Sequence, residues 1–213
     1  MHVPDGFLPL EVGLTGQGLT AGLLWFSLDR IRRLPQPTAG IPKTALLTAA
    51  FFAVSAIALP IPPTSIHLLL NGVMGIILGI YVFPAVWVGL LLQVLMFQHG
   101  GLLSLGVNSL IYGVPALLMA LLFHLRRWLP ERPWVTVLSG LCGSGGVMLS
   151  VGLFYGFTLM VTPDYWDEVL VRDELWRLVV WAHGPVALME GVFTILLVQF
   201  LQRVKPELIP TVR

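Results

Sequence analysis

Long apolar segments constrain this chain more than any other feature of its sequence. A helix needs about 20 consecutive, mainly apolar residues to cross a bilayer, and seven segments approach or exceed that length. They are residues 9–29, 44–61, 65–83, 84–99, 104–125, 134–161 and 174–202. The third and fourth meet around Pro84 and are individually short, so six spans plus a re-entrant segment is the alternative. The sequence predicts an all-α, polytopic membrane protein of about seven transmembrane helices.

The composition agrees with a lipid environment. Hydrophobic residues make up 56% of the 213 residues and charged residues only 11%, whereas a soluble domain averages about 25% charged residues. The mean hydropathy is +0.87. We therefore expect residues 1–213 to form one transmembrane domain. The net charge of +1 comes with dispersed basic residues, so no nucleic-acid partner is expected. The single Cys142 excludes an internal disulfide and a thiolate metal cluster.

The basic residues predict the orientation, because they concentrate in cytoplasmic connections. Ten of the twelve follow the first, fifth or last predicted span: Arg30, Arg32, Arg33, Lys43, Arg126, Arg127, Arg132, Arg203, Lys205 and Arg213. With seven spans these ten share one side. Arg172 and Arg177 lie in an acidic connection, which is then external. We predict an external N-terminus and a cytoplasmic C-terminus in a multi-pass protein of the plasma (inner) membrane.

Histidines are distributed unevenly in this topology. His2 lies at the external N-terminus, His67 opens the third span, His99 closes the fourth, and His183 lies in the outer half of the last span, whereas His124 lies at the cytoplasmic rim. Imidazole binds Zn, Cu, Co and Ni, and ionisable residues at membrane depth usually face a functional interior. The pattern favours a metal site in the outer half. The alternative is that each histidine satisfies a helix end or a packed polar network.

The N-terminus itself is a candidate chelator. It has no basic region typical of a signal peptide, and bulky His2 is expected to prevent removal of Met1. The Met1 amine, the deprotonated His2 backbone nitrogen and His2 Nδ1 would form two fused, nearly planar chelate rings. Cu(II) and Ni(II) accept such a nitrogen field, and Co(II) is compatible with it. Residues 3–6 contain Pro and Gly and predict a turn, and His67 is placed to supply a fourth nitrogen. We predict Met1, His2 and His67 as metal ligands.

Other polar residues are candidates for orienting those ligands or for lining the metal's pathway. Glu190 is the only acid deep in the predicted spans and shares a helix face with His183, seven residues earlier. Hydrogen bonding between helices is an equally good interpretation of Glu190. It is also the alternative interpretation of Asn71 and Asn108. The complete set of candidates is Asp5, Asn71, His99, Asn108, His183 and Glu190.

No catalytic residues are predicted, and we expect no enzyme. The sequence lacks the His-Glu-x-x-His motif of a zinc protease, and nothing orients Ser104 against His183. The Gly-rich residues 140–146 have neither the strand nor the lysine of a phosphate-binding loop. Close helix packing is the better interpretation there, as for Gly75-x3-Gly79 and Gly152-x3-Gly156. Alternatives to metal capture are a structural membrane protein and a stand-alone metal channel or secondary transporter, although no internal repeat is visible.

Four segments resemble the CbiM/NikM family, the substrate-capture components of energy-coupling-factor transporters for cobalt and nickel. They are MHVPDGFL at residues 1–8, IHLLLNG at 66–72, QHGG at 98–101 with LGVN at 105–108, and AHGP at 182–185 with EG at 190–191. The ending RVKPEL at 203–208 is also similar. The resemblance therefore covers nearly the whole chain, and the opening octapeptide is among its most specific parts.

The resemblance implies a function for the chain. It implies a site for Co2+ or Ni2+ built from the Met1 amine, His2 and His67, with the metal as transported substrate and no catalysis in this subunit. It also implies a membrane coupling (T) subunit and cytoplasmic ATPase subunits as partners, and in cobalt systems often a small accessory membrane subunit. No nucleotide-binding motif occurs in the sequence, so we expect no nucleotide on this chain. The cobalt and nickel branches of the family share these motifs.

Overall fold

The structure, a computed structural model, describes residues 2–57, 59–61, 64–128, 132–161 and 178–209. Within them the fold is helical, with one short antiparallel hairpin in which Leu59 lies opposite Ile66. The helices are α1 (Leu10–Arg32), α2 (Ile41–Ser55), α3 (Asn71–Leu78), α4 (Val82–Phe97), α5 (Leu105–His124), α6 (Arg132–Val161) and α9 (Gly184–Val204). The strands are β1 (Leu59–Ile61) and β2 (Thr64–Ile66), and single helical turns cover Gly79–Tyr81, Leu125–Trp128, Leu178–His183 and Pro206–Leu208.

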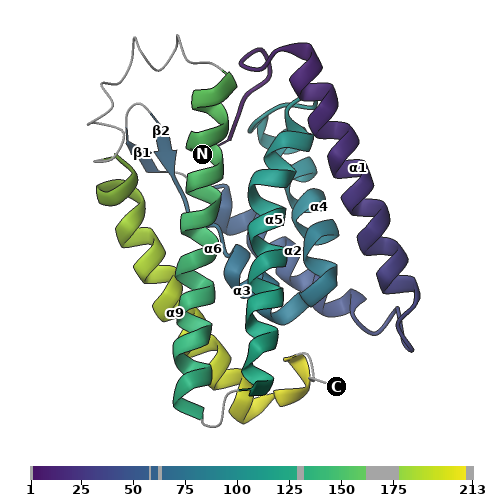
Figure 1. Cartoon of the computed structure of the whole chain (residues 1–213), viewed down its shortest axis with the longest axis vertical. Coiled ribbons are helices and arrows are strands. Elements are labelled where there is room, and N and C mark those ends of the chain that lie inside the picture. The colour runs from purple at the N-terminus through teal and green to yellow at the C-terminus, as the bar shows by residue number, and fades with distance from the viewer. Residues whose placement is uncertain (1, 58, 62–63, 129–131, 162–177, 210–213) are drawn as a thin grey trace.

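The long helices run side by side along the length of the molecule (Figure 1). Four stretches are long and apolar enough to cross a membrane: Asn71–Phe97, Leu105–Trp128, Pro133–Val161 and Val180–Val204. α1 has 23 residues and α2 is a shorter apolar helix of 15. The prediction of a helical membrane fold is confirmed at this level. The β1–β2 hairpin was not predicted, because it lies where the second and third predicted spans meet.

The third predicted span, residues 65–83, is not one continuous helix. It combines β2, a stretch at residues 67–70 without regular structure, and α3, which has only eight residues and is about 12 Å long. Gly79 then has a φ of +58°, which favours glycine because it has no Cβ. At this turn the Tyr81 hydroxyl donates to the Pro37 carbonyl at 2.8 Å, and α4 leads back towards the other end of the bundle (Figure 1). The third predicted span thus reaches the turn beside Pro37 as an interrupted helix and not as a continuous one.

Small residues bring the helices close together. A Cβ on Gly72 of α3 would collide with the Cys142 carbonyl of α6, and one on Gly143 would collide with Thr194 of α9. The expectation of close packing at residues 140–146 is therefore confirmed, and it holds for Gly75, which lies against α5. It is wrong for Gly79, Gly152 and Gly156: among the described residues, nothing lies within 4 Å of the Cβ position of any of these three.

The two ends of the bundle differ in chemistry. At the lower end in Figure 1, where α5 and α9 end, lie the basic residues that flank the helices. Lys43 Nζ, at the start of α2, donates there to the Ile77 carbonyl at 3.0 Å. At the upper end, α1 and α5 begin and α6 ends (Figure 1). Arg172, Arg177 and Arg213 lie outside the described residues, so the predicted membrane orientation stays a prediction.

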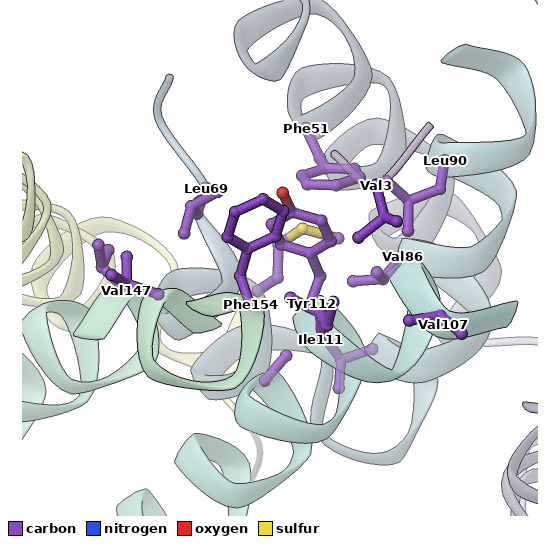
Figure 2. Packing of buried hydrophobic residues seen from close by; sticks show 14 of the residues in the cluster. Val3, Phe51, Leu69, Val86, Leu90, Val107, Ile111, Tyr112, Val147 and Phe154 are labelled. Atoms are coloured by element: carbon purple, nitrogen blue, oxygen red, sulfur yellow. The ribbon is translucent and has the colours of Figure 1, made fainter. Parts of the chain in front are cut away.

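The core reaches the upper end through the N-terminal segment, residues 2–9. Val3 is only 1% exposed and belongs to the same apolar cluster as the fully buried Tyr112 of α5. Figure 2 shows Val3 beside Phe51 and Leu90, with the Tyr112 ring close by. The first residues of the chain are thus packed inside the bundle, which places His2 among buried side chains.

Candidate metal site

The N-terminal segment is held in the bundle by an asparagine on α5. The Val3 amide donates to Asn108 Oδ1 at 3.0 Å, and Asn108 Nδ2 donates to the Val3 carbonyl at 3.0 Å. The side chain thus pairs with both backbone groups of Val3, as a neighbouring strand would. Because Asn108 is 2% exposed, these bonds are shielded from water. They fix the position of His2, the preceding residue.

A second attachment is made by Asp5. Its Oδ1 accepts from the Ser104 amide at 2.9 Å and its Oδ2 from the Leu103 amide at 3.3 Å. These are unpaired donors at the N-terminus of α5, where a carboxylate is favoured. Burial alone would raise the pKa of Asp5, but these amides hold the pKa below its usual value. Gly101 leaves room for this contact, since a Cβ there would collide with the carboxylate.

The predicted turn between these attachments is present. Gly6 has a φ of +85°, and the Phe7 amide donates to the Pro4 carbonyl at 3.4 Å. The turn folds the N-terminal segment back beside α5, as the Pro and Gly at residues 4 and 6 predicted.

The segment that carries His67 is held by Glu190 of α9. The Glu190 carboxylate accepts from the Leu69 amide and, at 2.9 Å, from the Leu70 amide. Glu190 is 1% exposed, so these two donors supply hydrogen bonds that its carboxyl group cannot receive from water. Leu70 has a left-handed φ of +51°, which turns the chain from this segment into α3. Glu190 therefore positions the backbone that presents His67.

Two imidazoles lie close together as a result. The ring centroids of His2 and His67 are 5.1 Å apart and their planes differ by 16°. His67 Nδ1 lies 3.1 Å from the Leu68 carbonyl, so this nitrogen carries the hydrogen and Nε2 keeps its lone pair. The Nε2 atoms of His2 and His67 are buried and have no hydrogen-bond partner among the described residues. Buried nitrogens of this kind are suited to bind an electrophilic ligand such as a metal ion.

The electrostatics favour a neutral His2 imidazole. Burial lowers the pKa of His2 well below its ordinary value. A charged imidazole loses its hydration in this environment, so the neutral form is preferred. The neutral form is also the one that coordinates metals. The His2 ring and the Nε2 atom of His67 are therefore both suited to act as ligands.

Two residues near these rings were not predicted from the sequence. The Tyr112 ring lies 5.5 Å from His2 and 6.2 Å from His67. Gln93 of α4 is fully buried, donates to Ser55 Oγ and interacts with the His2 imidazole. The signal that identifies Gln93 is an amide within an otherwise apolar helix, which is costly in a membrane and implies a partner. Tyr112 gave no such signal, because an aromatic residue in an apolar helix usually belongs to the core.

The remaining candidates lie in different surroundings. His99 is 6.0 Å from His2 between ring centroids. Asn71 Nδ2 donates to the Gly146 carbonyl at 3.0 Å and to Ser150 Oγ at 2.6 Å, which ties α3 to α6. His183 is buried and lies edge-on to Tyr155, at 5.8 Å between centroids. His124 is exposed at the lower end of the bundle. The predicted ligand Met1 lies outside the described residues.

Within the described part of the chain, no three His, Cys, Asp or Glu side chains converge in a way that would hold a metal ion. The site consists instead of two imidazoles, one of them on the second residue of the chain, and three side chains that bind the neighbouring backbone groups. Such an arrangement inside an apolar helical bundle defines a membrane protein with a buried ligand site, of the kind found in transport components.

The comparison with protein families identifies which one. A family model described as the cobalt uptake substrate-specific transmembrane region, CbiM, matches residues 2–208. The chain belongs to this family, which is one of metal-transport components and not of enzymes. The resemblance inferred from the sequence motifs is thereby confirmed.

Individual relatives match nearly the whole of this chain and are described as metal transport proteins. A putative metal transport protein of Haemophilus influenzae is 34% identical over 211 residues, covering 97% of this chain and 96% of the relative. A putative cobalt transport protein CbiM of Methanococcus voltae is 25% identical over 98% of this chain and 94% of its own length. A putative fused nickel transport protein NikMN of Archaeoglobus fulgidus is 27% identical over 98% of this chain and 68% of the relative.

Solved structures show the same fold. The crystal structure of a transition metal transporter superposes with a TM-score of 0.77 and 21% identity, covering 96% of this chain and 93% of that one. A truncated transition metal transporter superposes with a TM-score of 0.75 and 20% identity, covering 95% of this chain and 98% of that one.

Proposed function

We propose that this chain binds Co2+ or Ni2+ at its external N-terminus and delivers the ion for import as the substrate-specific component of an energy-coupling-factor transporter. One observation carries the proposal: the His67 ring, whose buried Nε2 has no hydrogen-bond partner among the described residues, lies 5.1 Å from the ring of His2, at the second position of the chain. Membership of a cobalt uptake family and relatives named for cobalt and nickel transport support the choice of metals.

The chemistry of the donor set fits these ions. The amine of Met1, the backbone nitrogen and Nδ1 of His2, and Nε2 of His67 would supply four nitrogens. Co2+ and Ni2+ bind such nitrogen donors well, whereas Mg2+ and Ca2+ prefer oxygen ligands. Asn108, Asp5 and Glu190 support the set, because each fixes a backbone segment that carries a ligand. A preorganised site loses less entropy on binding than a mobile N-terminus would.

The proposed topology places this site outside the cell. The basic residues gather at the lower end, and the positive-inside rule assigns that end to the cytoplasm of the plasma (inner) membrane. The short α3 and the segment before it would then complete the third of seven crossings. Energy for import would come from cytoplasmic ATPase subunits through a membrane coupling (T) subunit, with a small accessory membrane subunit in some systems.

Calorimetry with Ni2+ and Co2+ on the purified protein tests the site. One residue added before Met1 converts the amine to an amide, and we expect it to abolish high-affinity binding. His67→Ala removes a ligand and should do the same without loss of the fold. The control is His124→Ala, since His124 is exposed at the opposite end. Unchanged affinity in the extended protein would refute the N-terminal site.

Coupling requires a separate experiment. Radioactive Ni2+ uptake is compared between cells that produce this chain alone and cells that also produce coupling and ATPase subunits. We expect uptake only in the second case, and expect an ATPase-inactive variant to abolish it. Equal uptake by the chain alone would favour a stand-alone channel or secondary transporter.

A further inference from the structure

A third imidazole lies next to the proposed site and is not among its four nitrogen donors. His99 follows α4 and is partly exposed, whereas His67 is 8% exposed. The His99 ring centroid lies 6.0 Å from that of His2 and 5.9 Å from that of Phe97. His2 is partly exposed as well, so the pair formed by His2 and His99 lies closer to the surface of the bundle than His67 does.

The backbone around His99 is shaped to keep it there. Gln98, which is not a glycine, has a left-handed φ of +56°, and Gly100 has a φ of +82°. The His99 amide donates back to the Gln93 carbonyl at 3.3 Å. Gln98 is the C-cap of α4, a position at which left-handed backbone commonly ends a helix and redirects the chain. The two left-handed residues turn the chain so that His99 faces the N-terminal segment.

The same loop packs directly on the groups that hold the N-terminus. A Cβ on Gly100 would lie 3.0 Å from Asn108 Nδ2 and 3.8 Å from the His2 Cβ. The loop that carries His99 is thus in contact with the backbone that carries His2. The separation between the two rings is therefore set by packing and not by two independent mobile side chains.

The spacings suit a metal ion shared by two rings at a time. A metal lies about 2.0–2.1 Å from an imidazole nitrogen, so two ligating rings have centroids roughly 4.5–6.5 Å apart. Both pairs, His2 with His67 at 5.1 Å and His2 with His99 at 6.0 Å, fall in this range. Yet no three such side chains in the described part of the chain converge on one point. His2 can therefore pair with either neighbour, one after the other.

We propose that His99 and His2 form an outer capture site for a hydrated divalent transition-metal ion, which then passes to the inner site with His67. The inference rests on the proposed function and adds the order of events. In the transfer step the ion keeps its bond to His2, loses the bond to a His99 nitrogen and gains one to His67 Nε2. No electron moves in this step, and the protons released when the Met1 amine and the His2 backbone nitrogen bind the ion at the inner site pass to water.

This role has a kinetic signature. A ligand that binds the ion only on the way in and out lowers the barrier in both directions and leaves the final affinity unchanged. His99→Gln removes the imidazole but keeps a polar side chain. Stopped-flow measurement with Ni2+ should show association and dissociation slowed by a similar factor, about tenfold or more. His99→Asp supplies a carboxylate ligand and should restore part of the rate, and His124→Ala is the matched control.

A second measurement isolates the outer site. In His67→Ala the inner site lacks a ligand, so any weak Co2+ binding that remains should depend on His99. X-ray absorption of Co2+-loaded His67→Ala should show imidazole ligands, and the double variant His67→Ala, His99→Gln should lose this binding. Gel filtration in detergent checks that each variant is folded.

The outcomes separate the two proposals. If the wild-type protein binds neither Ni2+ nor Co2+, the proposed function fails. If the wild type binds but His99→Gln has unchanged rates, only the capture role fails. Weaker equilibrium binding with unchanged association would also overturn it, because His99 would then belong to the final site or to the fold.

Discussion

Asn108 provides the sharpest test of how the site is assembled, because its side chain binds both backbone groups of Val3, the residue after His2. Asn108→Ala removes both hydrogen bonds next to His2. A net contribution of about 0.5–1.5 kcal/mol for each bond gives about 1–3 kcal/mol for the pair. If the N-terminal segment must be docked for the ion to bind, this free energy appears as a loss of affinity. The expected change is about 5- to 150-fold weaker Ni2+ binding.

The assay is calorimetric titration of Ni2+ into protein in lipid nanodiscs, with thermal unfolding as a check on the fold. Ser109→Ala is a matched control on the same helix, since Ser109 Oγ donates only to the Leu105 carbonyl one turn earlier. Asn108→Asp keeps the acceptor for the Val3 amide and loses the donor, so its Ni2+ affinity should lie between those of the wild type and Asn108→Ala. A folded Asn108→Ala protein with wild-type affinity would refute the idea that docking of this segment limits binding.

Two further predictions concern charge. Since burial lowers the pKa of His2 well below its ordinary value, protons compete for this ring only in acid solution. Affinity should therefore fall with decreasing pH because the α-amine, with an ordinary pKa of about 7.7–8.0, becomes protonated. A titration series from pH 8.5 to 5.5 checks this, and a slope that steepens near the ordinary imidazole pKa of about 6.5 would contradict it. Glu190→Ala leaves the Leu69 and Leu70 amides without their buried acceptor and should weaken Ni2+ binding by about tenfold or more, whereas Glu190→Gln keeps one acceptor and should retain more affinity. Wild-type affinity in a folded Glu190→Ala protein, measured by calorimetry, would show that the carboxylate does not position His67.

The predicted sites that proved hardest to interpret from the sequence are those whose partners lie far along the chain. Asp5 was expected near the metal or its pathway, and it binds the amides at the start of α5, 98 and 99 residues away. Glu190 was left between two interpretations, and the structure shows it binding the segment next to His67 across 121 residues of sequence. A carboxylate looks the same in sequence whether its partner is a metal ligand, a metal or a backbone amide.

The third predicted span shows a related difficulty. Apolar residues continue from residue 65 to residue 83 with few polar interruptions, and a run of that length predicts a continuous helix. The structure divides it at Leu70 and Gly79, both with positive φ. Only the second of these is a glycine, so the first break gave no local signal. It depends on Glu190, which binds the Leu69 and Leu70 amides that a helix would otherwise have to satisfy.

The sequence by itself determined that the chain is a helical membrane protein, that it resembles a metal-capture family, and that its N-terminus turns back on itself. These properties depend on residues that are close together in the sequence: apolar runs, motifs of consecutive residues, and a turn with Pro and Gly. Tertiary structure decided which histidines are neighbours, that Gln93 and Tyr112 lie beside them, and that Asn108, Asp5 and Glu190 hold backbone. The physical reason is that a buried hydrogen bond is defined by two groups in space, and packing brings together groups that the sequence keeps about a hundred residues apart.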